Sequence, residues 1–257
     1  MSTEDLQKYL DFAKNLALEA GAIAKRAAED TALHVVSKDD NSPVTAADEA
    51  INRLVIERVQ QTFSNIGVLG EEESLNAEPT SGLLWVCDPI DGTIPFTLGI
   101  PISTFCLALV EDGEPVVGVV YHFGKDLLYA AAKGLGAFCN GEKLLPPQND
   151  PLLILPVETW HAAPNDIGMH VAKLRAAKYQ MPNFTSSAYE STLIMRGKLK
   201  GLLYAGNKPW DIAAQYVALN ELGFEVTDIY GRSQRYDGLI KGAFIGRRGL
   251  YAELFGA

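Results

Sequence analysis

Carboxylate side chains follow two apolar runs and stand at the start of one helical pattern. Glu71 opens an acidic triplet after IGVLG, Asp88 and Asp91 lie three positions apart in CDPIDGT, and Asp211 lies in PWDIAA. Carboxylate oxygens can bind a hard cation or transfer protons. Each position also has a plain structural explanation, because acids end strands in solvent, form turns and stabilise the first turn of a helix.

Asp48 is a further acidic candidate. Thr45 and Asp48 have the spacing of a capping box, in which the two side chains satisfy each other's backbone amides at a helix start. Capping alone would therefore explain an acid at this position.

Taken together, the acids gain a chemical meaning. α/β proteins present ligands at strand ends, and carboxylates converging there repel one another unless a cation joins them. The four histidines and three cysteines show no metal-ligand spacing and no C-x-x-C pair, which leaves oxygen ligands and favours Mg²⁺ over zinc. No Walker A loop or G-x-S-x-G elbow occurs. The pattern predicts metal-assisted displacement at phosphorus.

The first half of the chain predicts a sheet under two helices. Residues 4–29 have one apolar face with helical spacing, and a second helix is expected after Thr45. Short apolar runs follow, and one of them contains an Asp112-Gly113 hairpin signal. We expect a largely antiparallel sheet.

The second half alternates between the two kinds of element. Strand patterns occur in LLILPV, GLLYAG, FEVTDIYG and GAFIGR. Helices are expected from Pro164 to about Lys178, over residues 187–197, and from Pro209 to the stop at Gly223. The segment LLPPQNDP, residues 144–151, suggests a division into halves 1–146 and 147–257, of which the second carries Asp211.

The bulk properties limit the partners. The 257 residues carry a formal net charge of −10, which predicts no nucleic-acid partner and no membrane partner. No apolar run approaches the roughly 20 residues of a membrane span. The odd number of cysteines and the absence of a signal-peptide pattern in MSTEDLQKYL indicate a cytoplasmic protein.

Three motifs, in order and spacing, resemble the inositol monophosphatase family. They are GEE at 70–72, DPIDGT at 88–93 and WDIAA at 210–214; PVTAADEAI at 43–51 and KGLGAFCNGEKL at 133–144 are also similar to family segments. The resemblance implies an α/β (α+β) fold, a layered αβαβα sandwich, and a phosphatase inhibited by lithium. It also implies two or three Mg²⁺ ions, a small phosphorylated substrate and a homodimer.

The resemblance assigns roles to individual residues. Glu71, Asp88, Asp91, Asp211 and the backbone carbonyl of Ile90 are the implied metal ligands. Thr93 and Asp48 are implied to activate the attacking water, with Glu71 also counted as catalytic. The backbone amides of Gly92 and Thr93 are implied to bind phosphate, together with Asp91 and Asp211. Ser187, Ala188 and Asn207 are the candidates for a substrate wall.

Three places depart from the family pattern and put substrate recognition in question. Ile94 and Pro95 follow D-G-T where a polar residue and Asn or Glu are usual. Tyr204 stands seven positions before Asp211, where inositol enzymes often have an acid that contacts substrate, and Ser186 begins the stretch that usually reads G-S-A. We expect inositol 1-phosphate as substrate. Histidinol phosphate is the first alternative, followed by a sugar bisphosphate or a nucleotide 3′-phosphate.

Two other classes stay open. A phosphatase of the haloacid dehalogenase type also uses Asp and D-G-T, but it needs D-x-D spacing, and Asp88 and Asp91 are one position too far apart. A non-catalytic regulatory relative is the second, and the complete set of acids argues against it.

Overall fold

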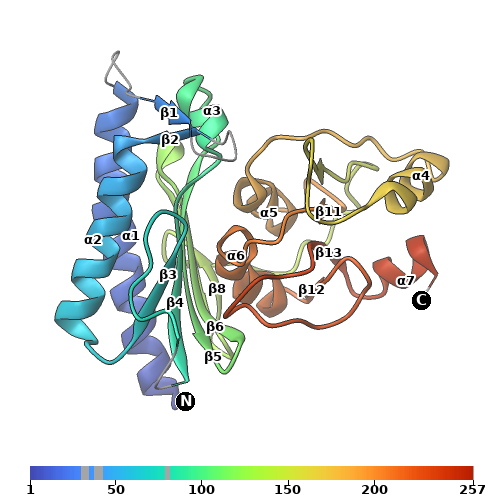
Figure 1. Ribbon diagram of the computed structural model, residues 1–257. Helices are drawn as coiled ribbons and strands as arrows, with labels where there is room; N and C mark the ends of the chain where they lie inside the picture. Colours follow the sequence, from blue (N-terminus) through green and yellow to red (C-terminus); the bar gives the residue numbers. More distant parts are fainter. Residues whose placement is uncertain (30–34, 38–42, 79–81, 257) are drawn as a thin grey trace.

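Helices and sheets alternate in five layers (Figure 1). The computed structural model describes residues 1–29, 35–37, 43–78 and 82–256. The outer helices are α1 (Thr3–Glu29) and α2 (Ala46–Thr62), and the middle helices are α5 (Ser187–Met195) and α6 (Trp210–Glu221). The helices of the far layer are α4 (Gly168–Ala176) and α7 (Leu250–Phe255). This is the predicted αβαβα sandwich.

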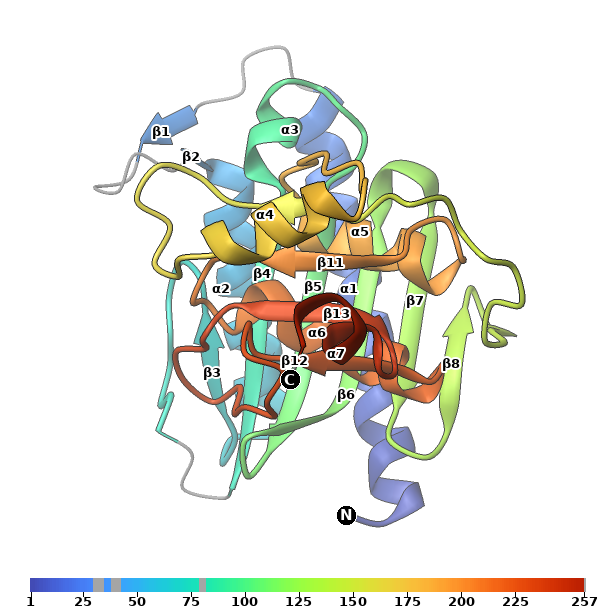
Figure 2. The ribbon, with the colours of Figure 1, turned by 90° about the vertical axis from the view of Figure 1, so that its right-hand side faces the viewer.

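The larger sheet lies between the outer and the middle helices (Figure 1), and Figure 2 looks onto its face. Its strand order is β3-β4-β5-β6-β7-β8-β9, antiparallel except for the parallel pair β3 and β4. The strands are β3 (Gly67–Gly70), β4 (Leu83–Asp91), β5 (Thr104–Glu111), β6 (Glu114–His122), β7 (Leu127–Ala132), β8 (Gly136–Cys139) and β9 (Glu142–Lys143). The expected hairpin at Asp112-Gly113 joins β5 to β6, and both residues adopt positive φ.

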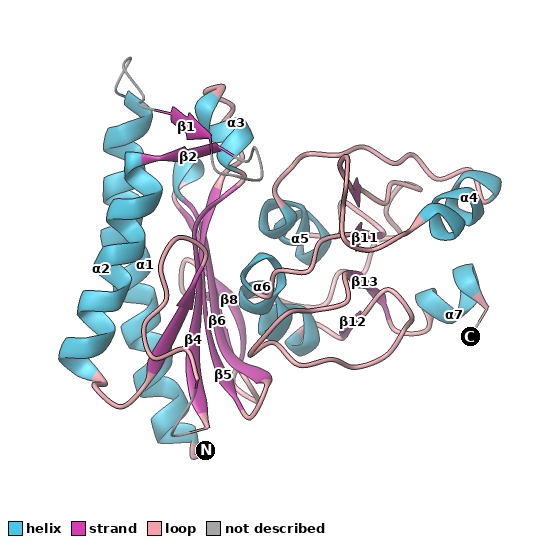
Figure 3. Ribbon diagram, in the orientation of Figure 1, coloured by secondary structure: helices cyan, strands magenta, loops and turns pink. Residues whose placement is uncertain are grey.

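The smaller sheet lies between the middle and the far helices (Figure 3). Its strand order is β10-β11-β13-β12. The strands are β10 (Val157–Glu158), β11 (Gly201–Tyr204), β12 (Phe224–Thr227) and β13 (Ala243–Arg247). Four short elements complete the fold: the paired strands β1 (Val35–Ser37) and β2 (Pro43–Thr45), helix α3 (Thr93–Thr97), and the 3₁₀ turn η1 (Phe123–Lys125).

Each interface between layers has an apolar core. Trp85 and Cys87 of β4 face α1 and α2, while Leu84 and Val86 of the same strand face α6. This alternation is the side-chain period of a strand with both faces buried. A third core, which includes Phe244, lies between the smaller sheet and α4 and α7. Cys87, Cys106 and Cys139 are all free thiols.

Two elements of the second half are shorter than expected. The helix expected from Pro164 begins at Gly168, because the backbone amide of Asn165 donates to Ala205 (3.1 Å) and ties this segment to the end of β11. Most of LLILPV is not a strand, since only Val157 and the following residue pair with β11. The helix expected from Pro209 begins one residue later, at Trp210, and Pro209 itself already has helical dihedral angles. No helix in the described part of the chain combines the length and apolarity needed to cross a membrane.

Candidate metal and phosphate site

A β-bulge brings Asp88 and Asp91 to the same face of β4. In a regular strand, residues three apart point to opposite faces. The pairing with β5 shifts between these two residues: Asp88 lies opposite Cys106 and Asp91 opposite Thr104, so β4 holds one extra residue. Pro89 lies within the bulge and has no amide for the ladder, which suits it to this position. β4 thus extends through Asp91, where the sequence predicted a turn.

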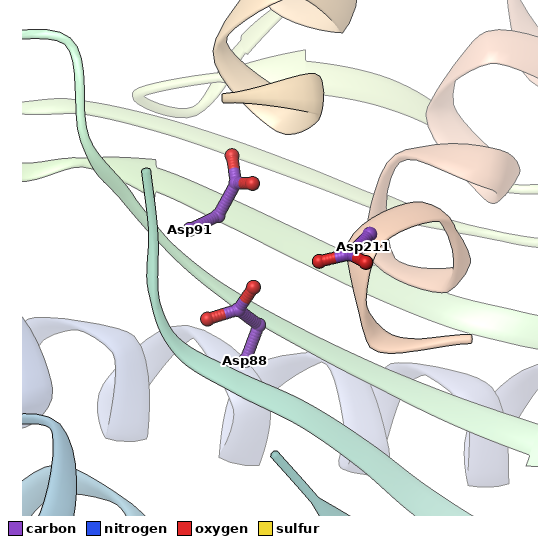
Figure 4. Close-up of side chains that lie close together, drawn as sticks. All are labelled: Asp88, Asp91 and Asp211. Atoms are coloured by element: carbon purple, nitrogen blue, oxygen red, sulfur yellow. The ribbon is translucent and has the colours of Figure 1, made fainter. Parts of the chain in front are cut away.

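Asp211 approaches this pair from the first turn of α6 (Figure 4). One ligand oxygen from each of Asp88, Asp91 and Asp211 lies within 4.8 Å of the others. Asp88 and Asp91 are buried and Asp211 is partly exposed. Two acids from the larger sheet and one from the middle helical layer therefore form a compact group of carboxylates.

Glu71 is not within that compact group, but its charge reaches it. It follows β3, and its backbone amide donates to the carbonyl of Cys87 on β4 (3.1 Å), the residue before Asp88. The buried Asn52 of α2 fixes the same loop by accepting from the amide of Glu72 (3.4 Å) and donating to the carbonyl of Glu73 (2.9 Å). The parallel strands β3 and β4 thus end side by side. Glu71 directly follows β3, and Asp91 is the last residue of β4.

Burial and mutual repulsion raise the pKa values of these carboxyls. Burial, followed by the charges of Glu71, Asp91 and Asp211, raises the pKa of Asp88 well above its ordinary value. Burial raises the pKa of Asp91 to about 6, although hydrogen bonds from Ser186, Ala188 and Thr104 lower it. For Asp211, burial and then the charge of Glu71 raise the pKa to about 8. Asp211 therefore holds a proton at neutral pH when no cation is present.

The donor set fits a hard divalent cation. The Oδ1 atom of Asp88 is buried and accepts no hydrogen bond within the part of the chain that is described. Three carboxylates at close range offer oxygen ligands only, the kind that Mg²⁺ prefers. A cation would remove the repulsion that raises the pKa values, so the geometry and the electrostatics agree.

Asp48 lies on α2 and makes the predicted capping box. Its Oδ2 atom accepts from the backbone amide (2.9 Å) and the hydroxyl (2.5 Å) of Thr45. It is fully buried, and its charge contributes to the raised pKa of Asp88. Asp48 is therefore both a helix cap and part of the electrostatic environment of the acids.

The D-G-T turn connects β4 to α3. The hydroxyl of Thr93 donates to the carbonyl of Ile90 (3.2 Å), the carbonyl implied as a metal ligand. Gly92 has a φ of 84°, and a Cβ there would lie 2.9 Å from the Cβ of Ser186, so glycine is required by both conformation and space. This contact joins the turn to the start of α5.

Hydrogen bonds from the start of α5 hold Asp91 and Asp211. The hydroxyl of Ser186 (2.5 Å) and the amide of Ala188 (3.0 Å) donate to Oδ2 of Asp91, and the hydroxyl of Ser187 donates to the backbone carbonyl of Asp211. Ser187 and Ala188 are buried, and their assignment to a substrate wall stays a prediction. Asn207, also assigned there, is partly exposed after β11, and its carbonyl accepts from the amide of Ile240 (2.9 Å).

Sequence reasoning did not find three other residues around the acids. Thr104 donates to Oδ2 of Asp91 (3.2 Å), a contact that depends on strand pairing and has no local signal. Glu158 on β10 and Glu190 on α5 are buried, and burial raises both pKa values well above the ordinary range. The charges of Asp91 and Glu190 add to the raised pKa of Glu158. Glu190 is an acid within the pattern of an expected helix, and this was the sequence signal that could have identified it.

The chain belongs to the inositol monophosphatase family, whose model matches residues 5–254. It is 30% identical over 226 residues to the inositol-1-monophosphatase of Bacillus subtilis (strain 168), covering 86% of this chain and 85% of the relative. It is 31% identical over 227 residues to the fructose-1,6-bisphosphatase/inositol-1-monophosphatase of Aquifex aeolicus (strain VF5), with coverage of 86% and 85%.

A solved structure has the same fold. The extragenic suppressor protein suhB from Bartonella henselae matches with a TM-score of 0.84 and 26% identity, over 96% of each chain. Fold, family and acid cluster thus define a phosphatase of the metal-dependent inositol monophosphatase family.

Proposed function

We propose that the protein hydrolyses a small phosphate monoester with Mg²⁺, and that inositol 1-phosphate is its principal substrate. The observation that supports this most directly is the convergence of Asp88, Asp91 and Asp211 within 4.8 Å. Two or three bound Mg²⁺ ions would supply the positive charge that activates water and neutralises the phosphate and the leaving oxygen.

The proposed metal ligands are Glu71, Asp88, Asp91, Asp211 and the carbonyl of Ile90. The positions of the three aspartates, and of Glu71 beside β4, support this set. With its pKa raised to about 8, Asp211 holds a proton at neutral pH while no cation is bound, so cation binding releases this proton and restores the negative charge.

Thr93 and Asp48 are proposed to orient the attacking water and take its proton. The hydroxyl of Thr93 lies at the end of β4, and Asp48 is close enough to affect the pKa of Asp88. The amides of Gly92 and Thr93 are proposed to hold the phosphate oxygens, with Ser187, Ala188 and Asn207 near the organic part of the substrate.

Alternative substrates follow from the relatives and from the departures noted in the sequence. The name of the Aquifex relative includes a fructose bisphosphatase, which supports a sugar bisphosphate alternative. Histidinol phosphate and a nucleotide 3′-phosphate are further alternatives. A non-catalytic regulatory role is the second candidate function, and the similarity to a protein named extragenic suppressor protein suhB is the observation that favours it.

A phosphate-release assay over a panel of substrates tests the proposal. Inositol 1-phosphate, glycerol 2-phosphate, histidinol phosphate and fructose 1,6-bisphosphate would be compared by kcat/KM with Mg²⁺, and Asp91→Asn protein would serve as the inactive control. The highest value for inositol 1-phosphate would support it, and a histidinol phosphate value about 100-fold above the others would overturn the choice of substrate. No release from any substrate would favour the regulatory alternative.

The remaining properties are proposed from family membership and from the composition and charge of the sequence. We propose a cytoplasmic homodimer that lithium inhibits and that binds neither nucleic acid nor membrane. Light scattering would give the oligomeric state, and phosphate release at increasing lithium concentration would test inhibition. Unchanged rates well above millimolar lithium would contradict the lithium proposal.

A further inference from the structure

Tyr204 ends β11 with its side chain directed at a proposed metal ligand. Its hydroxyl donates to Oδ2 of Asp211, seven residues further along the chain. Only 3% of Tyr204 is exposed, so its ring offers little surface to a substrate. The position at which a substrate-contacting acid was expected instead holds a buried phenol whose hydroxyl is engaged by Asp211.

Gly206 makes room for this phenol. A Cβ added to Gly206 would lie 2.0 Å from the hydroxyl oxygen of Tyr204 and 2.2 Å from its Cζ, far inside contact distance. The φ of Gly206 is not in the left-handed region, so its backbone conformation does not itself require glycine. Position 206 is glycine because the end of the Tyr204 ring fills the space that a side chain would need.

Asp91 is held in the same way. Its Oδ2 atom accepts from the hydroxyls of Thr104 (3.2 Å) and Ser186 (2.5 Å) and from the amide of Ala188 (3.0 Å). When hydrogen-bond donors hold one oxygen of a carboxylate, they fix the orientation of the whole group. The other oxygen then points in a defined direction. Hydrogen bonds of this kind orient metal ligands and set their affinity. Tyr204 is the corresponding side-chain donor for Asp211.

The backbone of Asp211 is also anchored, so its carboxylate is the part left to be oriented. The hydroxyl of Ser187 and the side-chain amide of Gln215 both donate to the Asp211 carbonyl. These two contacts fix where α6 begins, but they leave the side-chain torsions of Asp211 free. The phenol hydroxyl acts on those torsions.

We propose that Tyr204 is a positioning residue that orients the metal-binding carboxylate of Asp211, in a space provided by Gly206; this inference rests on the proposed Mg²⁺ function. It gives Tyr204 a role toward the metal where the sequence suggested a role toward substrate hydroxyls. Tyr204→Phe keeps the ring and removes the hydroxyl, whereas Gly206→Ala keeps the hydroxyl and displaces it.

Mg²⁺ titration by calorimetry, without substrate, is the primary test. We expect the Mg²⁺ Kd of Tyr204→Phe to rise by about 10- to 100-fold, the range seen when a hydrogen bond to a metal ligand is removed. Gly206→Ala should raise it similarly, and adding Gly206→Ala to Tyr204→Phe should have no further effect on the Kd. Tyr236→Phe is the matched control, because Tyr236 is fully buried in the same half and outside the site.

Kinetics with glycerol 2-phosphate separate the possible roles. At saturating Mg²⁺, Tyr204→Phe should have a KM close to that of the wild type, with the deficit confined to low Mg²⁺. An unchanged Kd with a raised KM would make Tyr204 a substrate contact, and no change in either would reduce it to packing; both results overturn the proposal. If calorimetry detects no Mg²⁺ binding by the wild type, the proposed function itself fails, which is a different result from equal binding by wild type and variant.

Discussion

At the scale of single residues, the carboxylates of the site lower the stability of the folded chain while no cation is bound. Burial and mutual repulsion raise the pKa values of Asp88, Asp91 and Asp211. The same two effects make the ionised groups unfavourable in the folded chain. Replacing Asp91 or Asp211 by Asn should lower turnover on the order of 10³-fold or more, because charge stabilisation by a metal is worth several kcal/mol. In chelator, the same variants should melt above the wild type; melting below it would contradict this explanation.

Asp48 allows capping and catalysis to be separated. Asp48→Asn should lower turnover on the order of 10²-fold, the scale of general acid–base assistance, and should cost about 1 kcal/mol of stability as a lost cap. Thr45→Ala removes the partner of the capping box but keeps the carboxylate, so it serves as the control. It should lose similar stability with a much smaller loss of turnover. Equal turnover losses in the two variants would show that Asp48 acts only as a cap.

Individual acids were predictable because their motifs are local. Glu71, Asp88, Asp91 and Asp211 follow apolar runs or open a helix, and those patterns are visible in the chain. The donors that hold them were not predictable. Thr104 contacts Asp91 through the pairing of two strands, and Tyr204 contacts Asp211 across the gap between β11 and α6. Side-chain contacts between elements depend on packing, for which a single sequence has no local signal.

At the scale of elements, the bulge in β4 decides whether the site exists. Deleting Pro89 should remove the bulge and leave Asp91 two positions after Asp88 on the same face, but without the bulged backbone that presents the carbonyl of Ile90. We expect loss of Mg²⁺ binding and of phosphate release. Pro89→Ala, which keeps the strand length, is the control and should retain both in large part. A deletion variant that binds Mg²⁺ as tightly as the wild type would show that the bulged backbone is not needed for the site.

The buried acids of β10 and α5 predict how stability depends on pH. The pKa values of Glu158 and Glu190 are raised in the folded chain, mainly by burial, so their contribution is fully present below the ordinary glutamate pKa and is lost as pH rises through the raised values. The melting temperature of the metal-free wild type should therefore fall between pH 5 and pH 9. Glu190→Gln cannot ionise at this position and should flatten the fall. Parallel curves for the two proteins would contradict the assignment.

Element boundaries were predictable where periodicity was long and unpredictable where other segments intervened. The pattern over 4–29 matches α1 closely, because an apolar face repeated at helical spacing over so many residues fits only a helix. Pro164 is a good first residue for a helix, but the Asn165 amide donates to the carbonyl of Ala205, and the helix begins only at Gly168. LLILPV has the composition of a strand, yet it lies mainly beside the smaller sheet and pairs with it only at its end.

At the scale of the whole molecule, the metal site joins separate layers. Asp88 and Asp91 belong to the larger sheet and Asp211 to α6, so a bound ion ties the sheet to the middle helices. Mg²⁺ at about 100 times its Kd should stabilise the fold by about 2.7 kcal/mol. For a chain of this size, that is a rise of roughly 5–10 °C in melting temperature. Scanning fluorimetry with Mg²⁺ and with chelator measures it, and Asp211→Asn should show little rise.

The position of α6 has a consequence for the chain during its synthesis. The acids of β4 leave the ribosome long before Trp210–Glu221, and β13, the strand that joins β11 to β12, comes later still. Nascent chains fold from the N-terminus, so the larger sheet can form while its acids still face water. Asp211 reaches them only when the smaller sheet closes over α6. A truncated or half-made chain should therefore release no phosphate from cellular metabolites, and the appearance of activity marks the completion of the molecule.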